Sequence, residues 1–197
     1  MPKTFRVVGG DTLIERMFHK RGWEKKDNPD LLVFSGGEDV TPMLYGEGAH
    51  PKTYYSEKRD KEESWEYLTN RNKYKVGICR GGQFLNVMNG GRMFQHVDNH
   101  GGSHWITDHD TGEKVFVTST HHQMMRPAGG KIVCTANLCT QAETDKGPWP
   151  DWQEGHDYEV VYYSNTFSLC FQPHPEYELK SCEDYFFKLL AKYYGFK

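Results

Sequence analysis

The most informative stretch of the chain is Lys75-Val76-Gly77-Ile78-Cys79-Arg80-Gly81-Gly82-Gln83. It joins a short apolar run to the start of an expected helix, and the cysteine at the junction has glycines close by on both sides. Small neighbours permit the strained turn of a nucleophile elbow, which lifts the central side chain out of a sheet. The N–H groups and dipole of the following helix favour a thiolate at Cys79, and the N–H of Arg80 can donate to an oxyanion. A lone cysteine at a glycine turn is more often a small buried residue, so this interpretation needs support elsewhere in the chain.

Short apolar runs around this stretch predict an α/β fold. The expected strands are residues 5–8, 31–34, 75–78, 114–118, 132–135, 159–163 and 168–171, and the expected helices are residues 12–22, 58–67, 82–89 and 182–194. The alternation of strand and helix in the first half predicts a flavodoxin-like, mostly parallel sheet with helices on both faces. The denser strands of the second half predict an antiparallel extension of that sheet. The high charge of residues 58–67 predicts a solvent-facing helix.

Composition limits the classes of protein that this chain can represent. It has 197 residues, 27 acidic and 24 basic, with a formal net charge of −3 and no repeat or linker, so we expect one domain over residues 1–197. Interleaved charges give no basic stripe for nucleic acid. The sequence shows neither a long apolar run nor a secretory signal, which predicts a cytoplasmic protein without membrane contact. Its five cysteines lack paired spacing and suit reduced thiols.

A histidine near the end of the chain supports the catalytic interpretation of Cys79. His174 and Glu176 follow an apolar strand, with a proline on each side of the histidine. A cysteine nucleophile needs a base to take and return its proton, and the base needs a third group to hold its tautomer. His174 and Glu176 can fill these two roles.

A pair of glycines also follows an apolar strand at residues 34–40. Gly36 and Gly37 would let backbone N–H groups approach a bound anion or carbonyl, which would supply a second oxyanion donor. Taken alone, this pair reads as an ordinary glycine turn.

Together these motifs resemble the class I glutamine amidotransferase superfamily, nearest to the gamma-glutamyl-gamma-aminobutyrate hydrolase (peptidase C26) branch. The matching segments occur in the family's order: Ser35-Gly36-Gly37-Glu38-Asp39-Val40-Thr41-Pro42, Tyr45-Gly46-Glu47, Gly77-Ile78-Cys79-Arg80-Gly81-Gly82-Gln83, His121-His122-Gln123 and His174-Pro175-Glu176. The resemblance implies a compact class I amidotransferase fold and a Cys-His-Glu triad that attacks the side-chain carbonyl of glutamine or of another gamma-glutamyl amide.

The resemblance also implies a role for each matching residue. Cys79 would be the nucleophile, His174 the base and Glu176 the orienting acid. The backbones of Gly37 and Arg80 would form the oxyanion hole. Substrate contacts would fall at Gly36, Gln83, His121 and Gln123.

Two related activities and one loss of activity are compatible with these motifs. In the first, the chain is a glutaminase that forms a gamma-glutamyl thioester and passes ammonia to an ATP-dependent synthetase partner. In the second, it is a free-standing hydrolase of a gamma-glutamyl amine conjugate. No phosphate-binding loop is present, so amide synthesis would need a second protein. A binding protein that has lost catalysis is disfavoured by the intact triad.

The branch usually carries a longer segment before the glycine pair, and here only one helix fits between Val8 and Leu31, so we expect a sheet element to be missing.

A histidine-rich segment offers metal binding as an alternative of another class. His96, His100 and His104 recur at intervals of four, with Asp98, His109 and the His121-His122 pair nearby, and imidazole with carboxylate suits zinc. The pair Gly101-Gly102 would break any helix that aligned the three histidines. We therefore expect neither a functional metal nor a cofactor.

Overall fold

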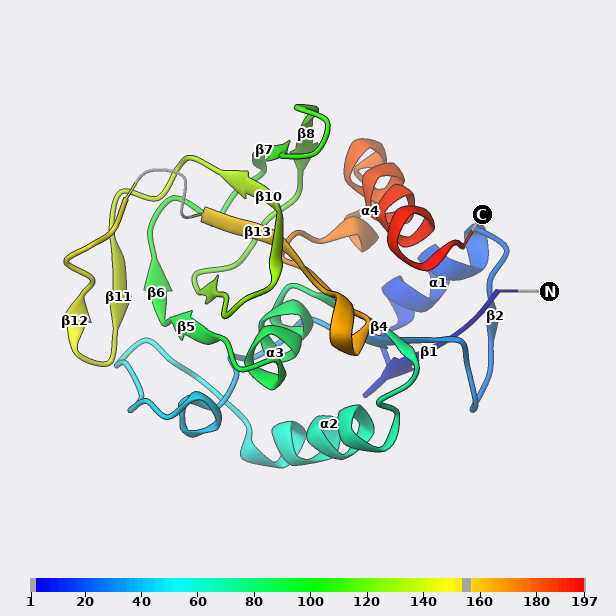
Figure 1. Cartoon of the computed structure of the whole chain (residues 1–197), viewed down its shortest axis with the longest axis horizontal. Coiled ribbons are helices and arrows are strands. Elements are labelled where there is room, and N and C mark those ends of the chain that lie inside the picture. Colours follow the sequence, from blue (N-terminus) through cyan, green and yellow to red (C-terminus); the bar gives the residue numbers. More distant parts are fainter. Residues whose placement is uncertain (1–2, 154–156, 197) are drawn as a thin grey trace.

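A nine-stranded sheet runs through the computed structural model, which describes residues 3–153 and 157–196 (Figure 1). The strand order is β2-β1-β3-β4-β14-β13-β10-β7-β8. The first five strands pair in parallel, and β13, β10, β7 and β8 continue the sheet in antiparallel pairing. The predicted parallel half with an antiparallel extension is therefore confirmed.

The large sheet contains β1 (Thr4–Val8), β2 (Glu24–Lys25), β3 (Leu31–Phe34), β4 (Tyr74–Ile78), β7 (His104–Asp108), β8 (Lys114–Val117), β10 (Lys131–Ala136), β13 (Asp157–Tyr163) and β14 (Ser168–Phe171). Two small sheets contain β5 (Arg92–Phe94) with β9 (Met124–Arg126), and β6 (His96–Val97) with β11 (Ala142–Thr144) and β12 (Gly147–Pro148). The helices are α1 (Thr12–Lys20), α2 (Glu57–Thr69), α3 (Arg80–Met88) and α4 (Lys180–Tyr194), with short 3-10 turns η1 (Pro42–Tyr45), η2 (Ser164–Thr166) and η3 (Pro175–Tyr177).

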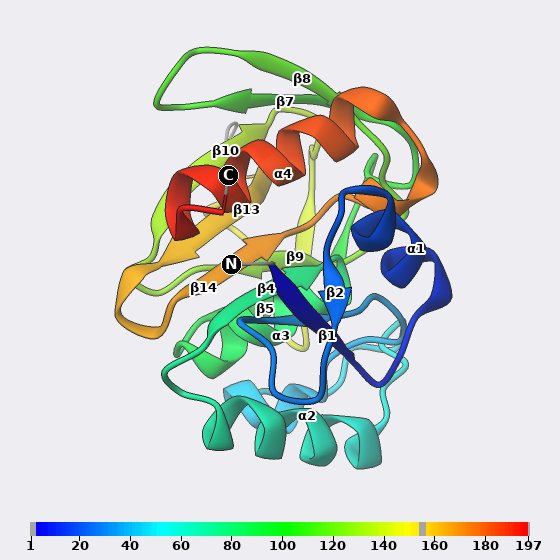
Figure 2. The ribbon, with the colours of Figure 1, turned by 90° about the vertical axis from the view of Figure 1, so that its right-hand side faces the viewer.

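Helices cover both faces of the parallel half, and each face has its own apolar core. On one face α1 and α4 pack against the sheet, with Phe5, Phe18 and Phe186 fully buried between them (Figure 2). On the opposite face lie α2 and α3, and Phe34 stacks on Phe84 there. Because both faces are covered, the central strands are apolar on both sides, as parallel strands require.

Local sequence signals explain where the helices begin and end. Asp11 caps α1 by accepting the backbone N–H groups of Leu13 and Ile14. The helix α4 ends at Gly195, which adopts a left-handed conformation. Within the described residues, no helix has the length and the apolar character needed to span a bilayer.

Each strand and helix predicted from the sequence is present, within a few residues of the predicted ends. Between Val8 and Leu31 the chain forms α1, as expected, and also the two-residue edge strand β2, which was not predicted. The prediction that residues 58–67 form a solvent-facing helix is wrong for one face of α2. Asp60 and Glu63 on that face are 2% exposed, because they meet a buried arginine of α3.

Candidate active site

Three neighbouring strands of the parallel half deliver the site residues to one edge of the sheet. The register pairs Phe34 of β3 with Gly77 of β4, and Ile78 of β4 with Phe171 of β14. The loops that follow these strands carry the glycine pair, Cys79 and His174, respectively. Parallel strands present their carboxyl ends at one edge, which is where ligands bind in such sheets.

Cys79 occupies a strained turn between β4 and α3. Its φ of 51° and ψ of −114° are unfavourable for a residue that has a Cβ, as the nucleophile-elbow interpretation requires. The turn is held because the backbone N–H of Cys79 donates to the carbonyl of Phe171 at 2.8 Å. A side chain on Gly81 would collide with the backbone of Phe34, so the motif needs a glycine there. Cys79 remains 7% exposed and lines a cavity.

His174 lies in the same cavity and has a partner on each ring nitrogen. Its Nδ1 is 2.7 Å from Oε1 of Glu176, and its Nε2 is 2.9 Å from the hydroxyl of Thr120. Burial alone would lower the pKa of His174, but hydrogen bonds to Cys79 and Glu176 and their charges raise it to about 10. The raised pKa favours an imidazolium beside Cys79, and Glu176 orients the ring as the carboxylate of a triad does.

The aromatic ring of Tyr177 lies flat against His174. The two ring centroids are 4.5 Å apart and the planes differ by 1°. Neither Tyr177 nor Thr120 was singled out from the sequence. Thr120 precedes the predicted pocket segment by one residue and Tyr177 follows the predicted acid by one, but neither position has a pattern of its own.

The cavity has a volume of about 370 Å³ and gathers most of the residues predicted from the sequence. Its lining includes Gly37, Cys79, Arg80, Gln83, His121, Gln123 and His174. Glu176 lies behind His174, outside the lining. Gly36, a predicted substrate contact, is not part of the lining either, and a Cβ there would be 3.2 Å from Cε1 of His174.

The predicted substrate contacts are linked to one another. The side-chain amide of Gln83 donates to the backbone carbonyl of Gln123 at 3.2 Å. The side-chain amide of Gln123 in turn donates to the hydroxyl of Thr53 at 3.2 Å. The Oε1 atom of Gln123 has no hydrogen-bond partner in the part of the chain that the structure describes. His121 lines the cavity, but its Nδ1 is 3.0 Å from the carbonyl of Gln123 and its Nε2 is directed away, toward Glu159.

A buried network of charges lies beneath the glycine pair and the nucleophile turn. The side chain of Arg80, 1% exposed, forms ion pairs with Asp60 and Glu63 of α2. Glu63 also accepts from Arg59 at 2.9 Å.

Arg59 connects this network to the glycine loop. Its guanidinium donates to the backbone carbonyls of Ser35 and Gly36 at 3.0 and 2.9 Å, and it pairs with Glu38 at 2.8 Å. Gly37 has a φ of 140°, and a side chain there would collide with Arg59. The loop that carries the predicted oxyanion donor is therefore fixed from below by α2.

The other cysteines have no comparable surroundings. Cys134, Cys139, Cys170 and Cys182 are buried, and desolvation raises the pKa of Cys134, Cys139 and Cys182 to about 12. A buried thiol of high pKa is a poor nucleophile. These four residues fit the structural role predicted for them.

Solved structures define the class of this fold. A chain from Thermoplasma acidophilum named "putative gmp synthase subunit a protein" superposes with a TM-score of 0.64 at 17% identity, covering 90% of this chain and 86% of that one. A glutamine amidotransferase from Thermotoga maritima gives a TM-score of 0.59 at 14% identity, covering 98% of this chain and 85% of that one. The protein therefore has the α/β fold of class I glutamine amidotransferases.

The sequence itself assigns the family within that class. The family model Peptidase C26 matches residues 25–143, and the chain belongs to the peptidase C26 family. "Putative glutamine amidotransferase Rv2859c" of Mycobacterium tuberculosis is 35% identical in an alignment 183 positions long that covers 80% of this chain and 53% of that protein. The chain spans about half the length of the curated relatives it matches. His174 and Glu176 lie beyond residues 25–143, which the family model matches, so the site geometry is what supports their role.

Proposed function

We propose that the protein is a cysteine-dependent glutaminase that hydrolyses the gamma-amide of glutamine and passes ammonia to a partner synthetase. The observation that carries this proposal is the shared cavity of Cys79 and His174, with Glu176 bonded to the far nitrogen of the histidine. Family membership supports the same chemistry.

In the proposed reaction, the proton of the Cys79 thiol lies on His174 before attack, and the sulfur attacks the side-chain carbonyl carbon of glutamine as a thiolate. The negative charge on the carbonyl oxygen is stabilised by the backbone N–H groups of Gly37 and Arg80. Collapse of this intermediate breaks the carbon–nitrogen bond, and ammonia leaves with the proton from His174. Water, activated by His174, then attacks the thioester and releases glutamate with the thiol restored.

A partner is proposed because one structural neighbour is by name a subunit of GMP synthase. An apolar groove of about 440 Å³ on α2, lined by Met43, Leu44, Trp65 and Leu68, offers surface for such a contact. The alternative is a free-standing hydrolase of a gamma-glutamyl amine conjugate, which would use the same triad with water as the acceptor.

The test measures ammonia and glutamate released from glutamine, and amine released from a panel of gamma-glutamyl amines. We expect turnover to fall by about 10⁴-fold or more in Cys79→Ala, since the nucleophile is lost. Cys139→Ala is the matched control, because that thiol is buried away from the cavity, and it should retain activity.

The outcomes separate the proposals. Turnover of glutamine, or a glutamyl adduct on Cys79 that forms from glutamine and is detected by mass spectrometry, supports the glutaminase. Turnover of an amine conjugate with little glutamine turnover identifies the free-standing hydrolase instead. If no substrate reacts and no adduct forms on Cys79, the proposed chemistry is wrong.

A further inference from the structure

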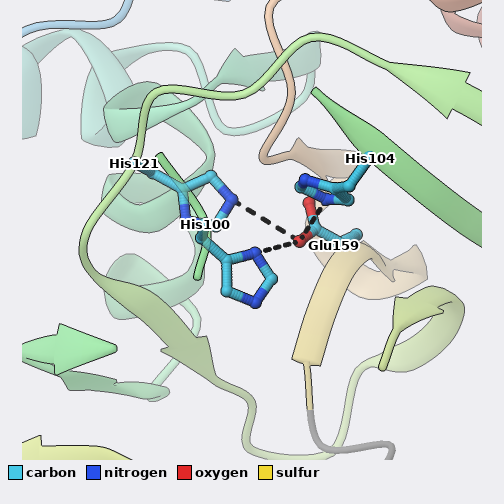
Figure 3. Close-up of side chains that lie close together, drawn as sticks. All are labelled: His100, His104, His121 and Glu159. Carbon is cyan, nitrogen blue, oxygen red and sulfur yellow. Dashed lines mark hydrogen bonds and ion pairs between the residues drawn. The ribbon is translucent and has the colours of Figure 1, made fainter. Parts of the chain in front are cut away.

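Three histidines and a glutamate gather in the antiparallel half of the molecule, outside the triad (Figure 3). His100 lies between β6 and β7, His104 begins β7, His121 follows β8, and Glu159 lies in β13. All four are buried, and one ligand atom from each lies within 4.8 Å of the others.

The outward nitrogens of two of these histidines fix the tautomers of their rings. Nδ1 of His104 lies 3.0 Å from the carbonyl of Gly102, and Nδ1 of His121 lies 3.0 Å from the carbonyl of Gln123. A carbonyl oxygen can only accept, so both Nδ1 atoms carry the proton. In the neutral rings, the Nε2 atoms then present lone pairs toward the centre of the cluster.

The third histidine is held in the same way by a carboxylate. Nε2 of His100 lies 3.1 Å from Oδ2 of Asp157, which also accepts the backbone N–H groups of Leu138 and Cys139. An ionised carboxylate that already accepts two bonds takes the ring proton of His100 as a third. Donation from the second nitrogen to a carboxylate or carbonyl is the usual support for a metal-binding histidine.

The inward atoms of the cluster are all acceptors when the rings are neutral. Oε1 of Glu159 lies 3.2 Å from Nδ1 of His100, 3.2 Å from Nε2 of His104 and 3.5 Å from Nε2 of His121. Among residues 3–153 and 157–196, Nδ1 of His100, Nε2 of His121 and Oε2 of Glu159 have no hydrogen-bond partner. Acceptors facing one another in a buried site repel unless positive charge lies between them.

Zinc fits the charge of this site and the three separations from Glu159, and the 4.8 Å spread of the ligand atoms would contract around a bound ion. In a tetrahedral zinc site with zinc–nitrogen bonds near 2.0–2.1 Å, neighbouring ligand atoms are about 3.3 Å apart, close to the three separations from Glu159. The two charges of the ion would be balanced by Glu159 and Asp157. Four protein ligands in a buried site leave no open position, which is typical of structural zinc.

We propose that His100, His104, His121 and Glu159 bind one structural zinc ion that fixes the wall of the catalytic cavity. The ion would act on the cavity through the residues on either side of His121. Thr120, which contacts His174, and Gln123, which lines the cavity, flank His121 closely. The glycine pair next to His100 does not prevent the site, because loops and strands rather than one helix bring the ligands together. His96 lies elsewhere, beside Lys52.

The test is the metal content of the untagged full chain, measured by inductively coupled plasma mass spectrometry. We expect about one zinc per chain, and tetrahedral cobalt absorption after cobalt replaces zinc. His104→Gln should weaken zinc binding by about 100-fold or more, since even supporting residues contribute 10- to 100-fold. The matched control His109→Gln removes an exposed histidine near the same strand, and it should retain the metal.

A second measurement does not depend on the folding of a variant. Wild-type protein stripped with a chelator should melt at a lower temperature and recover when zinc is added back. Stripped protein that takes up no zinc would show that two extra protons on the histidines balance the carboxylates instead, and the proposal would be overturned. Zinc retained equally in His104→Gln, or stoichiometric binding of another metal with zinc excluded, would also overturn it.

Discussion

The molecule contains two assemblies of histidine and glutamate that use the same chemical groups differently. In the parallel half, His174 bonds to Glu176 through Nδ1, and its Nε2 faces Thr120 in the cavity that Cys79 also lines. In the antiparallel half, each of three histidines turns one ring nitrogen toward Oε1 of Glu159. The other nitrogen of each ring lies against a backbone carbonyl or a carboxylate.

The difference lies in what the remaining nitrogen can reach. The Nε2 side of His174 faces a cavity that Cys79 also lines, so a proton held there can reach a bound molecule. The inward nitrogens of the second cluster meet only buried acceptors, so charge placed there stays and stabilises the fold. Residue type alone therefore does not separate a reactive histidine from one that holds structure.

The largest effect that tests this distinction is expected from Glu176→Gln. Loss of the carboxylate removes both the orientation of His174 and a charge that raises its pKa, so kcat should fall by about 10²- to 10⁴-fold. Because that pKa of about 10 should drop, the alkaline loss of activity should move to lower pH. A pH–rate profile measures both effects.

The control for Glu176→Gln is Glu178→Gln, two residues further on. Glu178 is exposed and pairs with Arg16 and Lys20, so its substitution should leave kcat unchanged. The interactions that raise the pKa of His174 also stabilise the folded state. Their contribution to the free energy of unfolding is complete below about pH 6.5 and is lost as pH rises through about 10. If Glu176→Gln lowers only the melting temperature, Glu176 holds structure as Glu159 does, and the comparison fails.

The second prediction concerns the buried charges that support the catalytic half without reacting. Glu63→Gln removes a carboxylate shared by Arg59 and Arg80, and we expect the free energy of unfolding to fall by about 3 kcal/mol. Denaturant unfolding measures the change. The neighbouring Glu62→Gln should change it by less than about 0.5 kcal/mol, since Glu62 is exposed. Equal effects at the two positions would mean that the α2 network does not support the site.

The sequence was sufficient to predict the strands and to select Cys79, His174 and Glu176, which the fold brings together, because the signals for both are local. The glycines around Cys79 and the prolines around His174 mark turns that directly follow apolar runs, and alternation of strand and helix places those turns at one edge. The parallel order of the strands then needed only general rules of α/β folds.

The parts that could not be predicted depend on contacts between distant residues. Glu63 is buried because Arg80, 17 positions later, reaches it, whereas the charge of α2 alone indicates exposure. His104 and Glu159 lie 55 positions apart, so no spacing pattern joins them. The histidine repeat at 96, 100 and 104 suggested one set, but the fold selects two of its members and adds His121.

The smallest effect is expected where His174, the proposed base, meets Tyr177. The ring of Tyr177 lies 4.5 Å from that of His174 and favours one orientation of the imidazole, a contact worth about 1 kcal/mol. Tyr177→Leu should therefore lower kcat by about five-fold, with KM nearly unchanged if the tyrosine acts only on the histidine. Tyr55→Leu, an exposed tyrosine outside the cavity lining, is the control. A rise in KM without a change in kcat would instead make Tyr177 a substrate contact, and the catalytic half would then owe the orientation of His174 to Glu176 and Thr120 alone.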